Sequence, residues 1–438
     1  MNNLRLILSK LLILHFAFCT EILSEPLTLD ECIQIALRQN PDVMRASLNW
    51  SASEVDIQTA KSDLLPQIQA STGYTRSGPE ARSWFTSTGE IITKNSYSTD
   101  FRAYQTIFDP NLYSRIKRSQ STGEFMEETL KETEATIILK TTEDYYNVLR
   151  SKRLVEVRRA ALVEREENLK KADRLLQLGS ASKADLLKAK VGVSQSKVEL
   201  VQAERDLEMA GANLSASLGY SPEERKGFME IEDDLGEVEL GLPDLSQLLK
   251  SAEGNRPEIA RSRARIRIAQ SDLFAARGRF LPRIAFSGSY SYSGPEFPRN
   301  REIWDERDTW NLNLDASWDL LPGYSRFTSV QRASRDVAIA QEDLRLQELT
   351  VALEVQRAYL ALKEALALLD LTQEAEAEAE ESYKASRGRY ELGAGTILEL
   401  TDAEVSLTEA RTRRIQSLYD YKIAKARMVK AVGSSRMQ

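Results

Sequence analysis

The sequence predicts a mainly α-helical protein with a small β part, in which long antiparallel coiled-coil hairpins are joined to pairs of strands. Three observations predict this fold class. The same motifs occur twice, apolar residues recur every seven positions over long stretches without proline, and four segments alternate apolar with polar residues. The composition agrees, because charged residues make up 29% of the 438 residues while Gly (20) and Pro (12) are few.

The duplication is visible at several anchors. "NPDVMRA" at Asn40 matches "RPEIARS" at Arg256, 216 residues later (256 − 40). "LGSAS" around Gly179 matches "LGAGT" around Gly393, 214 residues later (393 − 179). The small drift is what loop insertions in one copy produce. We therefore expect a first repeat over 27–219 and a second over 244–433, joined by an acidic surface linker over 220–243.

The N-terminus predicts a secretory signal peptide over 1–24. Two basic residues, Arg5 and Lys10, precede an apolar stretch from Leu11 to Phe18 that is too short to span a bilayer as a mature helix. Lipidation at Cys19 stays open, although Phe18 stands where a small residue is expected before a lipidated cysteine. We expect the chain to be exported.

The composition of the chain after the predicted signal peptide excludes most enzyme chemistry. The single histidine, His15, lies in the predicted signal peptide, and cleavage beyond Cys19 would leave only Cys32. A Ser/His/Asp or Cys/His triad, a histidine zinc site and an intramolecular disulfide are thereby excluded. No phosphate-binding loop is present, and a net charge of −7 without a separate basic face argues against nucleic acid. We predict a non-enzyme without cofactor or metal.

Each repeat contains a predicted strand hairpin, over 67–108 in the first and 283–320 in the second. In the second, Trp310, Leu312 and Leu314 alternate with polar residues; the first places Tyr97, Phe101 and Ile107 on one face. Strands of about ten residues with one apolar, aromatic-rich face are typical of outer-membrane barrels. Four strands cannot close a barrel, and open edges are not tolerated in lipid. The barrel must therefore be shared between protomers, with eight, twelve or sixteen strands.

Four prolines are predicted at junctions between strand and helix, where the missing N–H donor and fixed ring end a regular element. They are Pro66, Pro110, Pro282 and Pro322.

The coiled-coil hairpins are predicted over 112–218 and 324–432. In the second, apolar residues fall at strict sevens from Val330 to Ala365, with Val355, Leu362 and Leu369 between them; in the first, the sevens run from Val148 through Val155 to Leu162, Leu169 and Leu176. Each hairpin reverses at a glycine suited to a helix C-terminus, and Ser182 or Thr396 can begin the returning helix.

Taken together, these features resemble the TolC family of outer-membrane efflux and secretion channels. The most specific part is "YELGAGTILELTDAE" from Tyr390, which is similar to the family's Tyr-x-x-Gly-x-x-x-Ile-x-Asp-x-x-Asp-Ala pattern. The resemblance implies a homotrimer with a twelve-stranded transmembrane β-barrel in the outer membrane, in contact with its lipid, and an α-helical barrel that extends into the periplasm. It also implies a periplasmic adaptor protein and an inner-membrane transporter of the RND, ABC or MFS class as partners.

The resemblance also assigns site residues. Glu399 and Asp402 stand where the family places an acidic ring at the periplasmic aperture, with Glu in place of the first Asp. Asp185 and Tyr390 match positions of a contact in the closed state, although Gly395 stands where some members carry an Arg of that network. The adaptor-docking tips correspond to Leu178, Gly179, Ser182, Leu392, Gly393 and Thr396.

Two functions from different classes follow. The first is an outer-membrane exit duct of a tripartite efflux pump or a type I secretion system, which conducts its substrate passively. The second is a secreted coiled-coil scaffold without a pore, for which the alternating strands have no use. Whether the cargo is a drug, a metal ion or a protein is not encoded in this chain, because selectivity would belong to the transporter.

Overall fold

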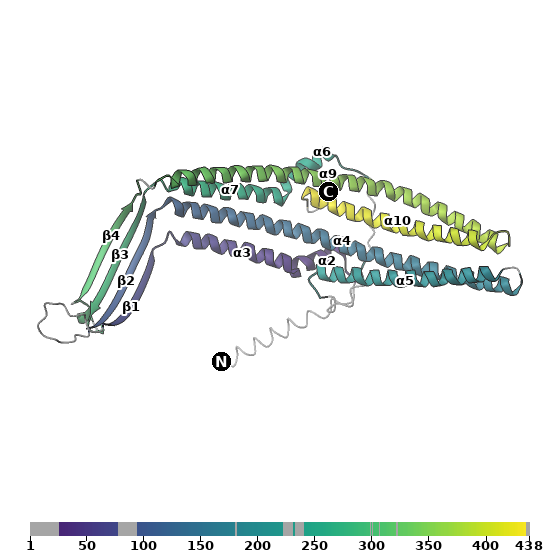
Figure 1. The fold of residues 1–438 in the computed structure, drawn as a ribbon, viewed down its shortest axis with the longest axis horizontal. Helices are drawn as coiled ribbons and strands as arrows, with labels where there is room; N and C mark the ends of the chain where they lie inside the picture. Colours follow the sequence, from purple (N-terminus) through teal and green to yellow (C-terminus); the bar gives the residue numbers. More distant parts are fainter. Residues whose placement is uncertain are drawn as a thin grey trace. The chain divides into compact units, whose positions relative to one another are not determined.

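The computed structural model describes residues 26–77, 94–179, 182–221, 231–232, 241–297, 299, 301–305, 307–320 and 323–434. It confirms the predicted fold class, with long helices and one small antiparallel sheet (Figure 1). The predicted signal peptide, Cys19 and Pro322 lie outside the described residues. The chain forms two compact units. The first comprises Met1–Ser47, Leu130–Pro257 and Glu348–Gln438, and the second comprises Leu48–Thr129 and Glu258–Gln347.

The two halves of the sequence contain the same series of elements, except that the short helix α8 lies between the two strands of the second half. The first half runs through α2 (Leu29–Gln39), α3 (Pro41–Ser62), β1 (Gln67–Ser77), β2 (Lys94–Phe108), α4 (Pro110–Gln177) and α5 (Lys183–Ser217). The second runs through α6 (Leu245–Asn255), α7 (Pro257–Gly278), β3 (Arg283–Gly294), α8 (Arg301–Asp305), β4 (Asp308–Ser317), α9 (Ser325–Glu391) and α10 (Ile397–Val432). In each half two helices precede the strand pair, since Pro41 and Pro257 each begin a new helix.

The repeat extends to individual capping contacts. Asn40, between α2 and α3, donates from Nδ2 to the carbonyl oxygen of Ser217 at the end of α5, at 2.9 Å. Arg256, at the matching place between α6 and α7, donates from Nη1 to the carbonyl oxygen of Lys430 at the end of α10, at 3.2 Å. Each side chain satisfies a carbonyl that the helix end leaves without a partner. Equivalent positions therefore terminate equivalent helices with different residues.

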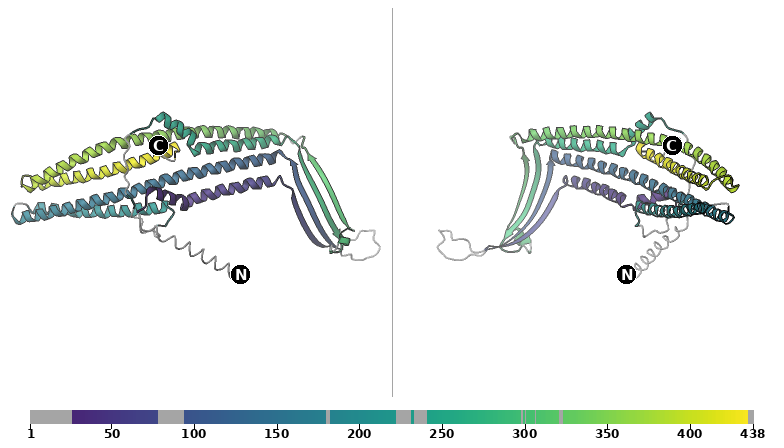
Figure 2. Two further views of the ribbon diagram at one scale, coloured as in Figure 1. Left: turned by 180° about the vertical axis from the view of Figure 1, so that it is seen from behind. Right: turned by 45° about the vertical axis from the view of Figure 1, so that its right-hand side comes forward.

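The first unit contains α4 from Leu130 onward with α5, and α9 from Glu348 onward with α10, so each long helix is paired there with the helix that returns from its tip (Figures 1 and 2). One core cluster includes Cys32 and Ala36 of α2, Tyr145 and Leu149 of α4, and Leu214 of α5. Of the predicted linker 220–243, residues 222–230 and 233–240 are outside the described part. Ile231 packs into this core, and the carbonyl oxygen of Glu232 accepts a 2.7 Å hydrogen bond from the Tyr145 hydroxyl.

The heptad prediction is confirmed for α9 from Val351 onward and only partly for α4. In α9 the buried positions Val351, Val355, Leu362, Ala365 and Leu369 follow steps of four, seven, three and four residues, whereas Val330, Val337 and Leu344 are only half-buried. In α4, Val148 and Val155 are buried as predicted. Beyond them the buried positions are Ala161, Asn168 and Ala172, so the frame predicted through Leu162, Leu169 and Leu176 is wrong there. The smaller Ala and Asn take the core positions, and the leucines stay half-exposed.

The second unit contains a four-stranded antiparallel sheet in the order β1-β2-β3-β4. The register aligns Phe101 with Tyr290 and Tyr290 with Trp310, so aromatic side chains from three strands share one face. That face also carries Ile68, Ala70, Tyr74, Tyr97, Ile284, Phe286, Leu312 and Leu314, whereas the opposite face is rich in Ser, Thr, Asn, Gln and Asp. Leu312 and Leu314 are 64% and 71% exposed. The chain therefore leaves a broad apolar sheet surface uncovered.

A bulge interrupts the regular alternation near the end of β2. The pairing of β2 with β3 shifts between Thr106 and Phe108, and Phe108 rather than Ile107 opposes Ile284 on the apolar face. Ile107 is the extra residue that the bulge inserts, which simple alternation cannot anticipate. Ile107 therefore has no partner residue on β3, and its placement on one face with Tyr97 and Phe101 stays a prediction.

The predicted junction prolines lie at element boundaries. Pro66 and Pro282 directly precede β1 and β3, and Pro110 is the first residue of α4. Among the residues that the structure describes, no helix carries an apolar stretch long enough to cross a bilayer.

Candidate functional site

The tips of the two hairpins contain the residues singled out in the sequence. Gly179 and Gly393 have φ angles of 71° and 72°, the left-handed conformation in which glycine ends a helix without steric cost. Leu178 and Leu392, directly before them, are 77% and 86% exposed. Each tip therefore presents one leucine side chain to solvent.

Both returning helices begin at the predicted N-caps. The Ser182 hydroxyl oxygen accepts from the Asp185 backbone N–H at 3.1 Å, and the Asp185 carboxylate accepts from the Ser182 N–H at 3.0 Å, a complete capping box. The Ser182 hydroxyl also donates to the Asp185 carboxylate at 2.7 Å. This bond and the bond from the Ser182 backbone N–H hold the pKa of Asp185 below its ordinary value. Thr396 caps α10 by accepting from the Glu399 N–H at 3.2 Å.

Glu399 and Asp402 lie three residues apart in the first turns of α10, and both are exposed. The structure therefore places the two predicted aperture carboxylates on one helix face. Arg389, near the end of α9, reaches across the tip: its Nη2 lies 3.7 Å from Glu399 Oε2 and donates to the Ala394 carbonyl oxygen at 3.2 Å. A Cβ on Gly395 would lie 3.1 Å from the Arg389 Cβ, so this turn leaves little room for a side chain at position 395.

Asp185 and Tyr390, predicted to contact each other in the closed state, are not hydrogen-bonded in this chain. Tyr390 is 8% exposed, and its hydroxyl has no hydrogen-bond partner among the described residues. Burial, and to a lesser extent the negative charge of Asp185, raises the pKa of Tyr390. The two side chains are thus close enough to interact electrostatically, while the Asp185 carboxylate accepts its hydrogen bonds from Ser182 in the capping box.

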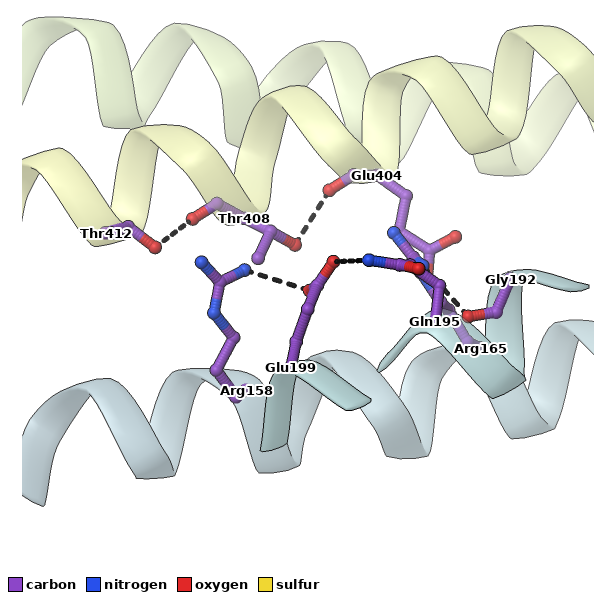
Figure 3. Close-up of polar contacts among 8 residues, drawn as sticks. All are labelled: Arg158, Arg165, Gly192, Gln195, Glu199, Glu404, Thr408 and Thr412. Atoms are coloured by element: carbon purple, nitrogen blue, oxygen red, sulfur yellow. Dashed lines mark hydrogen bonds and ion pairs between the residues drawn. The ribbon is translucent and has the colours of Figure 1, made fainter. Parts of the chain in front are cut away.

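A groove of about 750 Å³ lies beside the tips, between α5 and α10 and over α4. Leu187, Val191, Leu398 and Val405 supply its apolar walls. Arg158 and Glu199, joined at 3.2 Å, lie at one end, and Gln195 donates to Glu199 at 3.2 Å (Figure 3). Sequence reasoning did not identify this groove, because its walls come from segments about 200 residues apart.

Behind the groove lies a buried ion pair that sequence reasoning also missed. Glu404 of α10 is 3% exposed, and its Oε1 lies 3.7 Å from Arg165 Nε of α4 (Figure 3). Burial raises the pKa of Glu404 to about 7, against the lowering effect of Arg165. A signal was present, since Leu400, Glu404 and Leu407 follow the heptad steps of four and three. A charged residue at a core position marks a polar layer between the helices.

Further ion pairs connect α4 to the second hairpin. Besides Arg165 with Glu404 they are Glu143 with Arg427 (2.7 Å), Arg150 with Asp420 (3.2 Å), Glu164 with Arg411 (3.7 Å), Glu167 with Arg387 (3.9 Å) and Lys171 with Glu391 (2.7 Å). These five are partly exposed, so each contributes less than about 1 kcal/mol. Over the described part of the chain, no cluster of three or more His, Cys, Asp or Glu side chains could hold a metal ion.

Comparisons with known proteins agree on one family. The family model described as "Outer membrane efflux protein" matches residues 32–220 and 248–434. The probable efflux pump outer membrane protein TtgC of Pseudomonas putida is 23% identical over 411 residues, which is 92% of this chain and 82% of TtgC. The outer membrane protein TolC of Escherichia coli is 22% identical over 429 residues, 95% of this chain and 84% of TolC. The crystal structure of the Campylobacter jejuni CmeC outer membrane channel superposes with a TM-score of 0.82 at 18% identity, covering 92% of this chain and 85% of that one.

Proposed function

Because this chain belongs to the outer membrane efflux protein family, we propose that it forms the exit duct of a tripartite efflux pump or a type I secretion system. In this function the protein performs no chemistry. Its substrate would pass without a covalent step from an inner-membrane transporter through the duct, across the periplasm and outer membrane. The predicted outer-membrane location and the prediction of a channel rather than an enzyme are confirmed by the family.

The observation that carries the proposal is the uncovered apolar face of the sheet. Leu312, Leu314 and Trp310 of β4 point their side chains into solvent at 64%, 71% and 71% exposure. A soluble protein does not leave such a patch open, whereas lipid covers it at no cost. The polar opposite face then lines a lumen. This alternation is the arrangement of a transmembrane barrel with a water-filled interior.

The same sheet supports assembly with other copies. β1 and β4 are the two edge strands, and within the described part of the chain each has one side without a partner strand. In lipid, an unpaired backbone group costs several kcal/mol, so the edges require pairing with another chain. Three copies, the number that the resemblance implies, would close a barrel of twelve strands. β4 of one protomer would then pair with β1 of the next.

Exposed apolar stripes on the helices support the same head-to-tail assembly. On α9, Leu349, Leu353 and Leu360 are exposed at heptad spacing. On α5, Val191, Val198 and Val201 form a second exposed stripe. Two different stripes on one chain are what a heterologous ring interface uses, because each copy presents one of them to each neighbour. Coiled-coil packing between protomers would bury both.

The tips would face the other components of the system. Leu178 and Leu392 offer apolar contact points for a periplasmic adaptor protein, held by the turns at Gly179 and Gly393. The adaptor would connect the duct to an RND, ABC or MFS transporter, which would select the cargo. A secreted scaffold without a pore would use the hairpins equally well, but it gives no reason for an exposed apolar sheet with a polar reverse side.

The proposal is tested by fractionating cells that express the full chain and by recording from the purified protein. We expect a heat-labile oligomer in the outer-membrane fraction, together with ion conductance in a planar lipid bilayer. Monomeric protein in the soluble periplasm, without conductance, would be the outcome expected of the scaffold.

A further inference from the structure

Three helices of the first unit meet around one buried carboxyl group, that of Glu404 (Figure 3). Arg165 of α4 approaches it with Nε at 3.7 Å and donates through Nη1 to the carbonyl oxygen of Gly192 in α5, at 3.0 Å. Arg165 therefore contacts both hairpins, its own through Gly192 and the other through Glu404. The charge of Glu404 therefore bears directly on a contact between α10 and α4.

The pair is poorly satisfied in this arrangement. Arg165 Nε and Glu404 Oε1 are buried without a hydrogen-bond partner, and so is Nδ2 of the neighbouring Asn168. An ionised carboxylate that is buried without good hydrogen bonds loses much of its hydration energy, and one cation at 3.7 Å does not restore all of it. A neutral carboxyl group pays a smaller desolvation cost at the same place. The packed arrangement therefore favours the protonated form of Glu404.

The groups around Glu404 have both signs. They are Glu164 and Arg165 from α4, Tyr383 with Arg387 beyond it from α9, Arg411 of α10, which pairs with Glu164 at 3.7 Å, and Lys188 and Glu199 of α5, which line the groove beside Arg165. Burial raises the pKa of Glu404 most, Arg165 lowers it, Glu164 raises it and the nearby Asn168 side chain lowers it least, with the result of about 7. Arg165 is the cation that forms the ion pair with Glu404.

We propose that Glu404 is a proton-controlled positioning residue for the hairpin tips: α10 stays packed against α4 and α5 while Glu404 is protonated and separates from them when Glu404 ionises. The proposal rests on the proposed channel function, because separating the hairpins at their tips would widen the periplasmic end of the duct. Glu404 would act through Arg165 and through its own hydration, without touching the cargo.

The direction follows from proton linkage. The packed arrangement has a Glu404 pKa of about 7, and an arrangement that exposes Glu404 to water would return it toward the ordinary 4.5. The packed arrangement therefore binds the proton more tightly, and acid favours it. Between these two values each unit of rising pH favours separation by up to about tenfold per protomer. Above about 7 the effect levels off, because Glu404 is ionised in both arrangements.

The scarcity of histidine helps to assign a pH response of the hairpin tips to Glu404. The only histidine of the chain, His15, lies in the predicted signal peptide, so an imidazole of the mature chain would not be its source. Asp144 of α4 is another carboxyl group with a raised pKa, caused mainly by burial. It hydrogen-bonds Ser217 rather than a charged group of the second hairpin, which makes Asp144→Asn a matched control.

The experiment measures the distance between the two tips directly. Spin labels are attached at Leu178→Cys and Leu392→Cys in the full chain carrying Cys32→Ala, assembled with an excess of unlabelled chain, and the distance distribution is recorded from pH 5 to 9. We expect the separated population to rise with pH and level off near 7. Glu404→Gln should stay packed at every pH, and Asp144→Asn should behave as the parent does.

Two further variants give shifts of opposite sign. Arg165→Met removes the cation that lowers the Glu404 pKa. The separated population of this variant should therefore continue to rise to higher pH. Glu164→Gln removes a charge that raises the Glu404 pKa. The separated population of this variant should therefore level off at lower pH. The proposal would be overturned if the tip distances of the parent did not change with pH, or if the Glu404→Gln variant kept the parent's pH dependence. The labels report distance without a pore, so absent conductance would refute the channel and leave this result intact.

Discussion

Arg389 Nη2 lies 3.7 Å from Glu399 Oε2, across the turn that joins α9 to α10. One of the two carboxylates assigned to the periplasmic aperture is therefore partly compensated within its own hairpin tip. Both side chains are about half-exposed, so the pair is weak and Arg389 can move away. In a ring of three copies, the aperture would carry six carboxylates and three guanidinium groups.

Because the ring contains both carboxylates and guanidinium groups, removing one kind should have the opposite effect on cation block to removing the other. Like charges gathered in a confined mouth concentrate cations, so the purified channel should prefer cations and be blocked by multivalent cations from the periplasmic side. Glu399→Ala with Asp402→Ala should remove the block, whereas Arg389→Ala should strengthen it several-fold. Single-channel recordings in a planar bilayer measure both. Full block in the double variant would mean that the carboxylates form only a solvated helix face.

Asp185 and Tyr390 allow a separate prediction about closure. The Tyr390 hydroxyl has no hydrogen-bond partner among the described residues, so Tyr390→Phe should leave the stability of the protomer unchanged. If a neighbouring protomer supplies the partner, the same variant should raise the closed-state conductance. Asp185→Ala should raise it too, with an added loss of tip stability because the capping box is removed. Wild-type conductance in Tyr390→Phe would remove this hydroxyl from the closing contact.

The docking role of the tips is tested by a bulky residue. Gly179→Trp and Gly393→Trp should abolish transport while the trimer remains intact, because each places a large side chain at a turn that requires positive φ. Gly388→Trp is the matched control. It lies five residues before Gly393 in α9, and a Cβ there also meets no atom within 4 Å. The readout is cargo export from cells, and normal export by both tip variants would exclude the tips as the docking surface.

The assignment of the sheet faces predicts an asymmetric response to charge. Leu314→Arg places a charge on the apolar face of β4 and should cost about 2–4 kcal/mol near the bilayer midplane, strongly reducing the trimer in the outer membrane. Asn313→Arg changes the adjacent residue on the polar face and should be tolerated. Quantifying the unheated oligomer in membrane fractions compares the two. Equal losses would mean that the faces are not lipid and lumen.

A feature of the fold or of the tips could be predicted from the sequence when the residues that form it are close together in the chain. The strands of 283–320 and the core of α9 follow local periods of two and 3.5 residues, which the sequence displays directly. The tip caps at Ser182 and Thr396 are equally local. The break between α2 and α3 is local as well, since it is formed by a capping asparagine followed by Pro41.

The rest depends on contacts between distant segments. Arg389 with Glu399 needs the turn geometry, and Arg165 with Glu404 joins residues 239 positions apart (404 − 165). In a chain with 66 acidic residues, nothing marks one carboxylate as buried unless the heptad frame is carried through the last helix. The frame of α4 changes after Val155, because its core positions are set by the helices packed on it and not by its leucines alone.

The central claim, a barrel shared between chains, is tested most directly by cross-linking the two edge strands. In a Cys32→Ala background, one chain carries Asn313→Cys on β4 and, in separate variants, Gln69→Cys, Ser71→Cys or Thr75→Cys on the same polar face of β1. Within a chain, β2 and β3 separate these strands, so a disulfide can form only between chains. We predict that oxidation in the outer membrane gives covalent species of two and three chains and none larger. Single chains in every variant, or a ladder that continues beyond three, would contradict the account.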